Sequence, residues 1–387
     1  MRSFFHLLSL PCWRAAFVWV GVLGAGGALL GCRADSEKPG RAPSSESAAA
    51  AASASTQPRP AVTKPAVIEY SDPGNAGVVA YAKREGILER ELAAVNAQIE
   101  WVPGPGSFSA SFEAMNSGAI NASGGAVSPI IGGLAHNLQF RIYAIADPGG
   151  ARRAGVIAPA QSSIRKVSDL SGKRVAVNWA AHGDYILLRA LQERGVPAAQ
   201  VTRVPIQPPD AAAAFATGKI DAWSTFGVFF TTAVNNGAHI VVTEAELDSD
   251  DVGVLSAHKD ILSQNPAAFQ VLVRVIRDLT REGHREPEKF QNVFNDKGPR
   301  AVSGARLRED IEDTRTAPEF RVPTERDRVR VGNVMSLLHE NGSIDRAIAV
   351  DQIVFDIDSA AATQGAAAPG AAAEGTTTQA ATRDVVR

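Results

Sequence analysis

Two kinds of apolar pattern alternate along the middle of this chain. Short continuous apolar runs, which are typical of buried strands, lie at 67–70, 99–102, 140–146, 173–178 and 201–206. Apolar residues with helical spacing predict helices at 76–90, 109–117, 129–135 and 185–194. Ser128 and Asp210 are expected to be the N-caps of the helices that follow them. Because strands that alternate with helices are typical of βαβ units, the pattern predicts an α/β fold.

A ten-residue pattern occurs twice in the chain, one hundred residues apart. The segment AMNSGAINAS at 114–123 returns as AFATGKIDAW at 214–223. In each copy an apolar helical turn ends at a Gly, the usual left-handed residue after a helix, and a strand follows, predicted at 119–122 and at 220–223. The same order of helix, Gly and strand occurs in unrelated α/β proteins. We nevertheless favour two similar lobes whose strand-end loops face each other across a cleft.

After residue 258 the pattern becomes mainly helical. One helix is predicted from Pro266 to about Gly283 and another from Arg321 to Glu340. These helices are expected to return to the first lobe, so that the chain crosses between the lobes twice, near 153–159 and near 252–259. The predicted boundaries are 66–153 and 258–358 for the first lobe and 154–257 for the second.

The two ends of the chain lack the pattern of a folded domain. Residues 1–31 predict a lipoprotein signal peptide, because a basic start and a short apolar stretch lead into Leu29-Leu30-Gly31-Cys32, which resembles the lipobox of bacterial lipoproteins. Cys32 would then carry lipid and start the mature protein; an uncleaved anchor or an ordinary signal peptide is the alternative. Residues 32–65 predict a disordered tether and residues 359–387 a disordered tail, since their Ala, Ser and Pro runs cannot form a core.

The composition narrows the possible chemistry. The only cysteines are Cys12, in the predicted signal peptide, and Cys32, so we expect no disulfide, thiolate zinc site or Cys nucleophile in the mature protein. The net charge of −2 gives no support for nucleic-acid binding. The sequence holds no zinc-protease, EF-hand, nucleophile-elbow or P-loop motif. We therefore predict no catalytic residue, no metal and no cofactor.

The loops after the predicted strands carry small, hydroxyl and aromatic residues. In open α/β sheets ligands bind beyond the carboxyl ends of the strands, and N–H groups of the next helix can hold an anion there. Trp179, Trp223 and Phe226 are candidate apolar walls for a ligand, although Trp223 could equally pack in the core or at the hinge. His182 is either an anion donor or a solvated loop residue. Asp184 is favoured as the N-cap of the helix at 185–194.

The core of the chain resembles the bacterial solute-binding proteins for nitrate, aliphatic sulfonates and taurine, which are receptors of ABC importers. The most specific stretch is QPPDAAAAFATGKIDAW at 207–223. VSDLSGKRVAV at 167–177 is similar to the family's entry into a strand, and YILLRAL at 185–191 is similar to its second-lobe helix. Segments 67–75 and 114–129 occur in the family's order, so that the resemblance covers about 66–358.

This resemblance implies a two-lobed periplasmic-binding-protein fold of type II. Each lobe would be a mostly parallel sheet flanked by helices, and two hinge crossovers would allow the lobes to close on a ligand. In this family backbone amides and hydroxyls of the strand-end loops hold the anionic group of the ligand. The corresponding positions here are Ser71, Gly74, Asn75, Ser107, Ser123, Gly124, His182, Asp184, Tyr185, Trp223 and Thr225, to which we add Trp179 and Phe226. The chain departs from the family's pattern at 180–184 and 224–230. Trp179 and His182 would suit a larger or aromatic acid.

The resemblance also implies a function. The protein would be a periplasmic receptor without catalytic activity, tethered to the membrane through lipidated Cys32. As a monomer it would capture a small organic anion or zwitterion, such as a sulfonate, taurine or nitrate, and deliver it to an ABC permease in the inner membrane. Two alternatives remain open: an enzyme on the same fold, similar to pyrimidine-precursor synthases or menaquinone-pathway dehydratases, and a sensory lipoprotein that presents its ligand to a signalling partner.

Overall fold

The computed structural model describes residues 64–104, 108, 111–146 and 153–367. The chain divides into two units, Met1–Ala61 and Val62–Arg387, and every described residue belongs to the second. Several predicted features lie outside the described residues: the signal peptide at 1–31, the lipidation site Cys32, the tether as far as residue 63, the site residue Ser107 and the tail from residue 368 onward.

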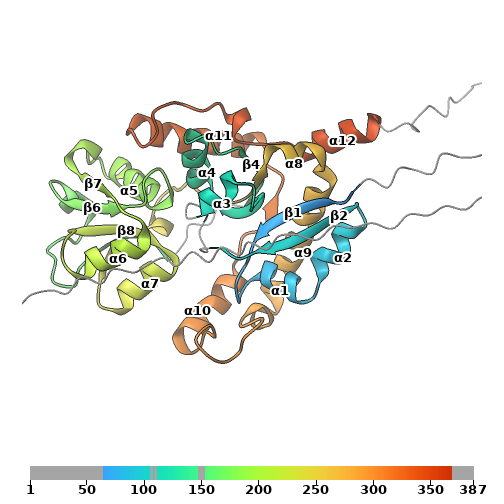
Figure 1. Cartoon of the computed structure of the whole chain (residues 1–387). Coiled ribbons are helices and arrows are strands. Elements are labelled where there is room, and N and C mark those ends of the chain that lie inside the picture. The colour runs from blue at the N-terminus through green and yellow to red at the C-terminus, as the bar shows by residue number, and fades with distance from the viewer. Residues whose placement is uncertain (1–63, 105–107, 109–110, 147–152, 368–387) are drawn as a thin grey trace, which may run out of the picture. The chain divides into compact units, whose positions relative to one another are not determined.

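Figure 1 labels most of the strands and helices that the described residues form. The strands are β1 (Ala66–Ser71), β2 (Ala97–Val102), β3 (Ala122–Ala126), β4 (Phe140–Ala146), β5 (Ala154–Ala158), β6 (Arg174–Val177), β7 (Thr202–Pro205), β8 (Ala222–Phe226), β9 (His239–Thr243), β10 (Gly253–His258) and β11 (Phe320–Arg321). The helices are α1 (Val78–Arg84), α2 (Ile87–Ala93), α3 (Phe112–Asn116), α4 (Val127–Ala135), α5 (His182–Glu193), α6 (Pro208–Ala216), α7 (Gly227–Asn235), α8 (Lys259–Gln264), α9 (Pro266–Arg285), α10 (Gly304–Arg315), α11 (Glu325–Glu340) and α12 (Ile357–Ala367). The order of elements confirms the predicted α/β fold.

The strands form two sheets, which define two lobes. The first lobe is built on a six-stranded sheet of order β11-β4-β10-β3-β1-β2, and the second on a five-stranded sheet of order β7-β6-β8-β5-β9. Both sheets are mostly parallel, as predicted: β1 is parallel to β2 and β3, and β6 is parallel to β7 and β8, whereas β10 and β5 are antiparallel to both of their neighbours. The reason is that β5 and β10 enter their sheets from the other lobe and not through a βαβ crossover within one sheet.

The two sheets have the same topology around the repeated segments. β3 lies between a parallel strand, β1, and the antiparallel crossover strand β10, while β8 lies in the same way between β6 and β5. The helix that follows each of them also begins alike. The Val127 N–H donates to the Val252 carbonyl oxygen at 3.2 Å, and the Gly227 N–H donates to the Arg153 carbonyl oxygen at 2.7 Å. The repeat therefore marks two equivalent lobes, as predicted.

Within each repeat the glycine turns the chain. Gly118 and Gly218 are left-handed, with φ of 79° and 68°, as expected after a helix. The residues that follow complete the turn and bury Ile120 and Ile220. The strands consequently begin two to three residues later than predicted, at Ala122 and Ala222. Ser123 therefore lies inside β3 and not in the loop after it, and Trp223, predicted as the last residue of its strand, lies inside β8.

Three helix starts differ from the prediction. α4 begins before Ser128, α6 before Asp210 and α5 before Asp184, so that each of these residues lies in the first turn of its helix and none is the N-cap. In α6 the first turn contains Pro208 and Pro209, whose fixed φ suits that position. In α4 the helix follows its strand directly, without the loop that the sequence prediction assumed.

Helices cover both faces of each sheet. In the first lobe α1, α2 and α9 pack on one face around Ile68 and Leu272, and α4 and α11 pack on the other around Ile142 and Val334 (Figure 1). In the second lobe alternate strand residues point to opposite faces, as the pleat requires. One face meets α5, and the other, with Trp223, meets α6 and α7.

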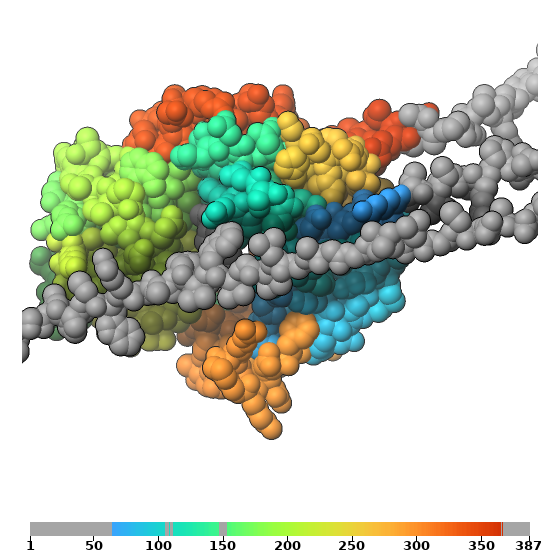
Figure 2. All heavy atoms as spheres, viewed as in Figure 1, coloured from blue at the N-terminus to red at the C-terminus, as the bar shows by residue number. Residues whose placement is uncertain are grey.

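The boundaries of the lobes also shift. β10 belongs to the first sheet, so that residues 253–257 join the first lobe and not the second. α12 extends to Ala367 and begins at the fully buried Ile357, so that residues 359–367 are helical and not part of a tail. α10 has no buried residue, and its atoms, orange in Figure 2, lie at the surface of the face shown. Among the described residues, no helix combines the length and apolar character that crossing a membrane requires.

Candidate ligand-binding site

Two predicted site residues of the first lobe meet where β1 ends and β3 begins. The hydroxyl oxygens of Ser71 and Ser123 lie 2.9 Å apart, within hydrogen-bond distance. Gly124 follows in β3, and a Cβ there would lie 3.7 Å from the Tyr70 hydroxyl and from a Leu255 methyl. The side of Gly124 that a side chain would occupy therefore faces the buried core. What β3 presents at this sheet edge is the serine pair and the polypeptide backbone.

An internal carboxylate occupies the N-terminus of α4. The Ser128 N–H donates to Asp251 Oδ1 at 2.7 Å, and the Ser128 hydroxyl donates to Asp251 Oδ2. Carboxylates are stabilised at this end of a helix because its first N–H groups have no partner within the helix. Asp251 stands in the crossover segment before β10, so it joins the first-lobe helix α4 to the polypeptide arriving from the second lobe.

His182 extends this connection into the second lobe. Its Nδ1 lies 2.8 Å from Asp251 Oδ2 and its Nε2 lies 3.3 Å from Glu244 Oε2. The imidazole also packs edge-on against Phe226, with ring centroids 5.1 Å apart. Since Phe226 is the N-cap of α7, the contacts from Ser128 through Asp251 and His182 to Phe226 link the starts of α4 and α7, the two helices that follow the repeats.

The surroundings of His182 favour its protonated form. Burial alone would lower the pKa of His182, but the carboxylates of Glu244 and Asp251 more than compensate, so that this pKa lies well above its ordinary value. Only 15% of the side-chain surface is exposed, so both ring nitrogens face protein groups and not bulk water. His182 is therefore a cation held between the Glu244 carboxylate of the second lobe and the Asp251 carboxylate of the crossover segment. It is not a solvated loop residue.

The charge on His182 predicts a loss of stability in mild alkali. Because the pKa is raised in the folded state, the stabilisation is complete below the unfolded pKa of about 6.5 and is lost as the pH rises through the folded pKa. We expect the free energy of unfolding in urea to fall above about pH 6.5, at up to about 1.4 kcal/mol per pH unit. His182→Gln should remove this dependence, whereas His339→Gln, at an exposed position in α11, should keep it. An unchanged slope in His182→Gln would contradict the role assigned to His182.

Two of the predicted site residues, Asp184 and Trp179, belong to a second polar cluster, in which their hydrogen bonds are made to other parts of the protein. The Asp184 carboxylate is fully buried and accepts from Arg203 Nη1 at 2.9 Å, from the Ser343 hydroxyl at 2.6 Å and from the Ala180 N–H at 3.1 Å. Trp179 Nε1 donates to the Ser343 carbonyl oxygen at 2.9 Å. Arg203 stacks on the Trp179 ring, with its guanidinium carbon 4.4 Å from the ring centroid. These bonds tie α5 and β7 of the second lobe to the segment that follows α11 of the first, and they leave the Asp184 carboxylate no free position for a ligand.

Tyr185, Asn75 and Gly74 also have partners within the protein. The Tyr185 hydroxyl accepts from the Asp250 N–H at 2.8 Å and its ring is buried. The Asn75 side chain donates to the carbonyl oxygens of Asn295 and Arg300, both at 3.0 Å, and so closes the loop after α9. Gly74 is left-handed and its N–H donates to the Asp72 carboxylate at 2.8 Å. The structure does not bring these three residues together with Ser71 and Ser123 by any bond among the described residues.

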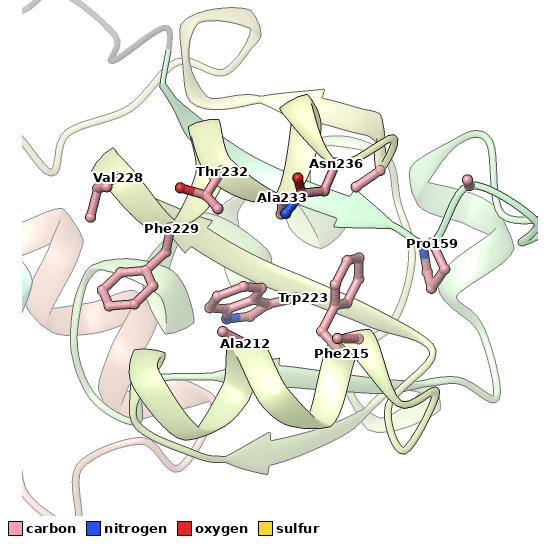
Figure 3. A pocket seen from close by; sticks show the side chains of 12 residues that line it. Pro159, Ala212, Phe215, Trp223, Val228, Phe229, Thr232, Ala233 and Asn236 are labelled. Carbon is pink, nitrogen blue, oxygen red and sulfur yellow. The ribbon is translucent and has the colours of Figure 1, made fainter. Parts of the chain in front are cut away.

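Trp223 points away from the contacts of His182. Its side chain is 2% exposed and lies on the face of the second sheet that α6 and α7 cover, between Phe215 and Phe229 (Figure 3). Thr225, two residues later on the same face, is 1% exposed, and its hydroxyl has no partner among the described residues. The neighbouring Ser224 hydroxyl is equally buried and equally without a partner there. A buried hydroxyl without a partner is costly, which makes Ser224 and Thr225 the polar groups of β8 most ready to bind something else.

Sequence reasoning missed the carboxylates that surround His182 and the cation that pairs with Asp184. Asp251 ends the polar run Asp248-Ser-Asp-Asp251 just before the predicted crossover, and that position was a usable signal. Glu244 and Arg203 carried no such signal, because their roles depend on contacts far away in the sequence. Among the described residues there is no group of three or more potential ligands placed to hold a metal ion.

Comparison with known structures identifies the fold. The alkanesulfonate-binding protein SsuA from Xanthomonas axonopodis pv. citri, solved bound to MOPS, matches with a TM-score of 0.65 and 19% identity over 76% of this chain and 99% of that one. The desulfurization enzyme DSZB matches with a TM-score of 0.51 and 16% identity, over 77% and 99% of the two chains. The chain has the two-lobed fold of periplasmic binding proteins, as predicted, and this fold also carries an enzyme.

The sequence comparisons show similarity to one family and to named binding proteins. Residues 127–289 match the family model described as NMT1/THI5 like. A protein of Escherichia coli (strain K12) named for the binding of aliphatic sulfonates is 30% identical over 165 residues, which are 42% of this chain and 50% of the relative. The chain thus spans about half the length of this curated relative. The matched residues run from the start of α4 to just beyond the end of α9, and the predicted resemblance to sulfonate-binding proteins is confirmed.

Proposed function

We propose that the protein is a periplasmic solute-binding receptor that captures a small organic anion or zwitterion, of the sulfonate, taurine or nitrate kind, between its two lobes. It is held at the membrane through lipidated Cys32, acts as a monomer and delivers its ligand to an ABC permease. The ligand lies near Ser71 and Ser123 of the first lobe and near Thr225 and Phe226 of the second.

The observation that carries the proposal is the linked pair of helix starts. The N-termini of α4 and α7 come from different lobes and are joined through Asp251, His182 and Phe226. Asp251 already accepts a hydrogen bond from the Ser128 N–H at the start of α4. The Ser224 and Thr225 hydroxyls of β8, beside the start of α7, have no partner among the described residues. Hydroxyl and backbone donors hold an anion without a cationic side chain, and closure of the lobes then follows from the higher affinity of the closed state.

A ligand screen of the full chain tests this proposal. A thermal-shift series with taurine, methanesulfonate, benzenesulfonate and nitrate should find a ligand that adds roughly 2.7 kcal/mol of stability at about 100 times its dissociation constant. The ligand should be recovered chemically unchanged after incubation. If some compound is instead converted to a product, the enzyme alternative holds, because this fold also supports an enzyme.

Thr225→Val separates binding from stability. Removing an unpartnered buried hydroxyl should raise the free energy of unfolding by about 1 kcal/mol, while losing a donor to the ligand should weaken its binding about tenfold. Thr217→Val changes an exposed hydroxyl that bonds only to its own helix and should alter neither quantity by much. Unchanged affinity in Thr225→Val would exclude this hydroxyl from the ligand site.

A further inference from the structure

A separate cavity lies on the second lobe between α6 and α7. Its volume is about 520 Å³, and its lining includes none of Ser71, Ser123, His182 and Asp251. Sites for small molecules typically have volumes of about 300–1,000 Å³. Figure 3 shows the Trp223 indole in the middle of this cavity, with Phe229 on one side and Phe215 on the other.

Small side chains keep this cavity open. α6 contributes Ala212 and Ala216, α7 contributes Ala233, and the strand ends beside them contribute Ala160 and Ala238. Where two helices cover a sheet, larger side chains normally fill the space between them at close-packed density. Here the aromatic rings stand at 5.8 and 6.1 Å from the Trp223 ring, centroid to centroid, and the alanines leave the space between the two helices empty.

The lining specifies the chemistry of an occupant. It contains no ionisable side chain, so an ion buried here would lose its hydration without gaining a partner. Three aromatic rings favour a flat or cyclic apolar group through offset or edge contacts. Thr232 and Asn236 are the polar lining residues, and Figure 3 shows both on the α7 side, where they can bond to one polar substituent.

The surface around the cavity argues against a protein partner. Among the described large apolar side chains that are exposed, only Val228, at 54%, lines the cavity. A stable protein interface buries about 800 Å² on each partner around an apolar centre, and a single exposed valine does not provide such a patch. The apolar surface at this place is concave and flanked by rings, which suits a small molecule.

We propose that this cavity binds a neutral aromatic or alicyclic small molecule that carries one hydrogen-bonding substituent. The site is independent of the interlobe ligand site and differs from it in ligand class, since the interlobe site is proposed to take an anion or zwitterion. Trp223, one of the residues predicted from sequence to contact the ligand, belongs to this second site.

Photolabelling of the full chain with trifluoromethyl phenyl diazirine, a neutral aromatic probe, tests the proposal. Labelling should saturate, should map to residues of α6, α7 and β8, and should be displaced by naphthol, a neutral ring with one hydroxyl. Labelling that rises without saturation, or that maps mainly elsewhere, would overturn the proposal.

Cavity-filling variants provide the control. Ala216→Leu, at the exposed rim, and Ala212→Leu, deeper between the helices, should each lower saturable labelling about tenfold. Ala213→Leu adds the same bulk at an exposed position of α6 outside the lining and should label like the unmodified chain. If Ala212→Leu does not fold, Ala216→Leu decides. Equal labelling of Ala216→Leu and Ala213→Leu contradicts the site, whatever either variant does to the ligand found for the interlobe site.

Discussion

Replacing Arg203 by Leu is expected to lower the free energy of unfolding by about 3–5 kcal/mol, because it leaves the Asp184 carboxylate buried without a cation. Asp184 has no exposed surface and Arg203 only 11%, so water cannot take the place of the missing guanidinium. The variant also loses the bond from Arg203 Nη1 to the Ser343 hydroxyl at 2.7 Å and the stack on Trp179. Several bonds between the lobes would thus be lost together.

Urea unfolding of matched variants isolates the buried charge. Arg274→Leu removes a pair with Glu91 in which both side chains are nearly half exposed, and it should cost no more than about 1 kcal/mol. Combining Arg203→Leu with Asp184→Asn should recover part of the loss, since the unpaired charge is then gone. A loss in Arg203→Leu no larger than in Arg274→Leu would show that Asp184 does not depend on its partner.

The architecture could be predicted from the sequence because the spacing of apolar residues and the repeated segment indicate which residues are buried. The two copies at 114–123 and 214–223 proved to be equivalent positions in two equivalent lobes. The crossings predicted near 153–159 and near 252–259 correspond to β5 and β10, which are antiparallel to their neighbours because they arrive from the other lobe. What the sequence missed was where some elements begin and end. β3 and β8 start later than predicted because the residues after Gly118 and Gly218 form a turn before each strand begins.

Only the parts of the candidate site that depend on neighbouring residues in the sequence were predicted. Ser71 at the end of β1 meets Ser123 near the start of the neighbouring strand β3. His182 meets Phe226 because the start of α5 and the end of β8 lie at the same edge of their sheet. Asp184 was assigned to the ligand or to a helix cap, yet its partner Ser343 lies 159 residues away in the sequence. Pairings of that kind are set by how the lobes pack, which composition and spacing do not encode.

Trp223 shows how one residue of a strand changes the interpretation. Successive side chains of a strand point to opposite faces, so a strand beginning at Ala222 places Trp223 under α6 and α7 while Phe226 contacts His182. The sequence left contact with a ligand and packing in the core as equal alternatives. Both remain relevant, because the indole is buried in the core and at the same time lines an open cavity.

Replacing Gly132 by Ala is expected to separate the two lobes. A Cβ at Gly132 in α4 would stand 2.2 Å from the carbonyl oxygen of Ala180, which belongs to the second lobe, and real Cβ atoms essentially never approach an atom so closely. Ala180 cannot retreat easily, because its own backbone is left-handed, with φ of 51°, and its N–H is bonded to the buried Asp184. The added methyl group should therefore push α4 away from the β6–α5 loop, at a cost of about 1–3 kcal/mol.

The direction of the change in the free energy of unfolding distinguishes Gly132→Ala from an ordinary Gly to Ala substitution. Gly to Ala in a helix interior normally stabilises by about 1 kcal/mol, and Gly332→Ala in α11 should do so, since its nearest neighbour, a Val350 methyl, lies at an ordinary 3.6 Å. Gly132→Ala should instead lower the free energy of unfolding in urea and increase the radius of gyration in small-angle scattering. It should also weaken any ligand held by both lobes, because the contacts from Ser128 through Asp251 to His182 depend on α4 and α5 staying together. Stabilisation of Gly132→Ala to the same extent as Gly332→Ala would mean that α4 and the Ala180 loop are not in contact in solution.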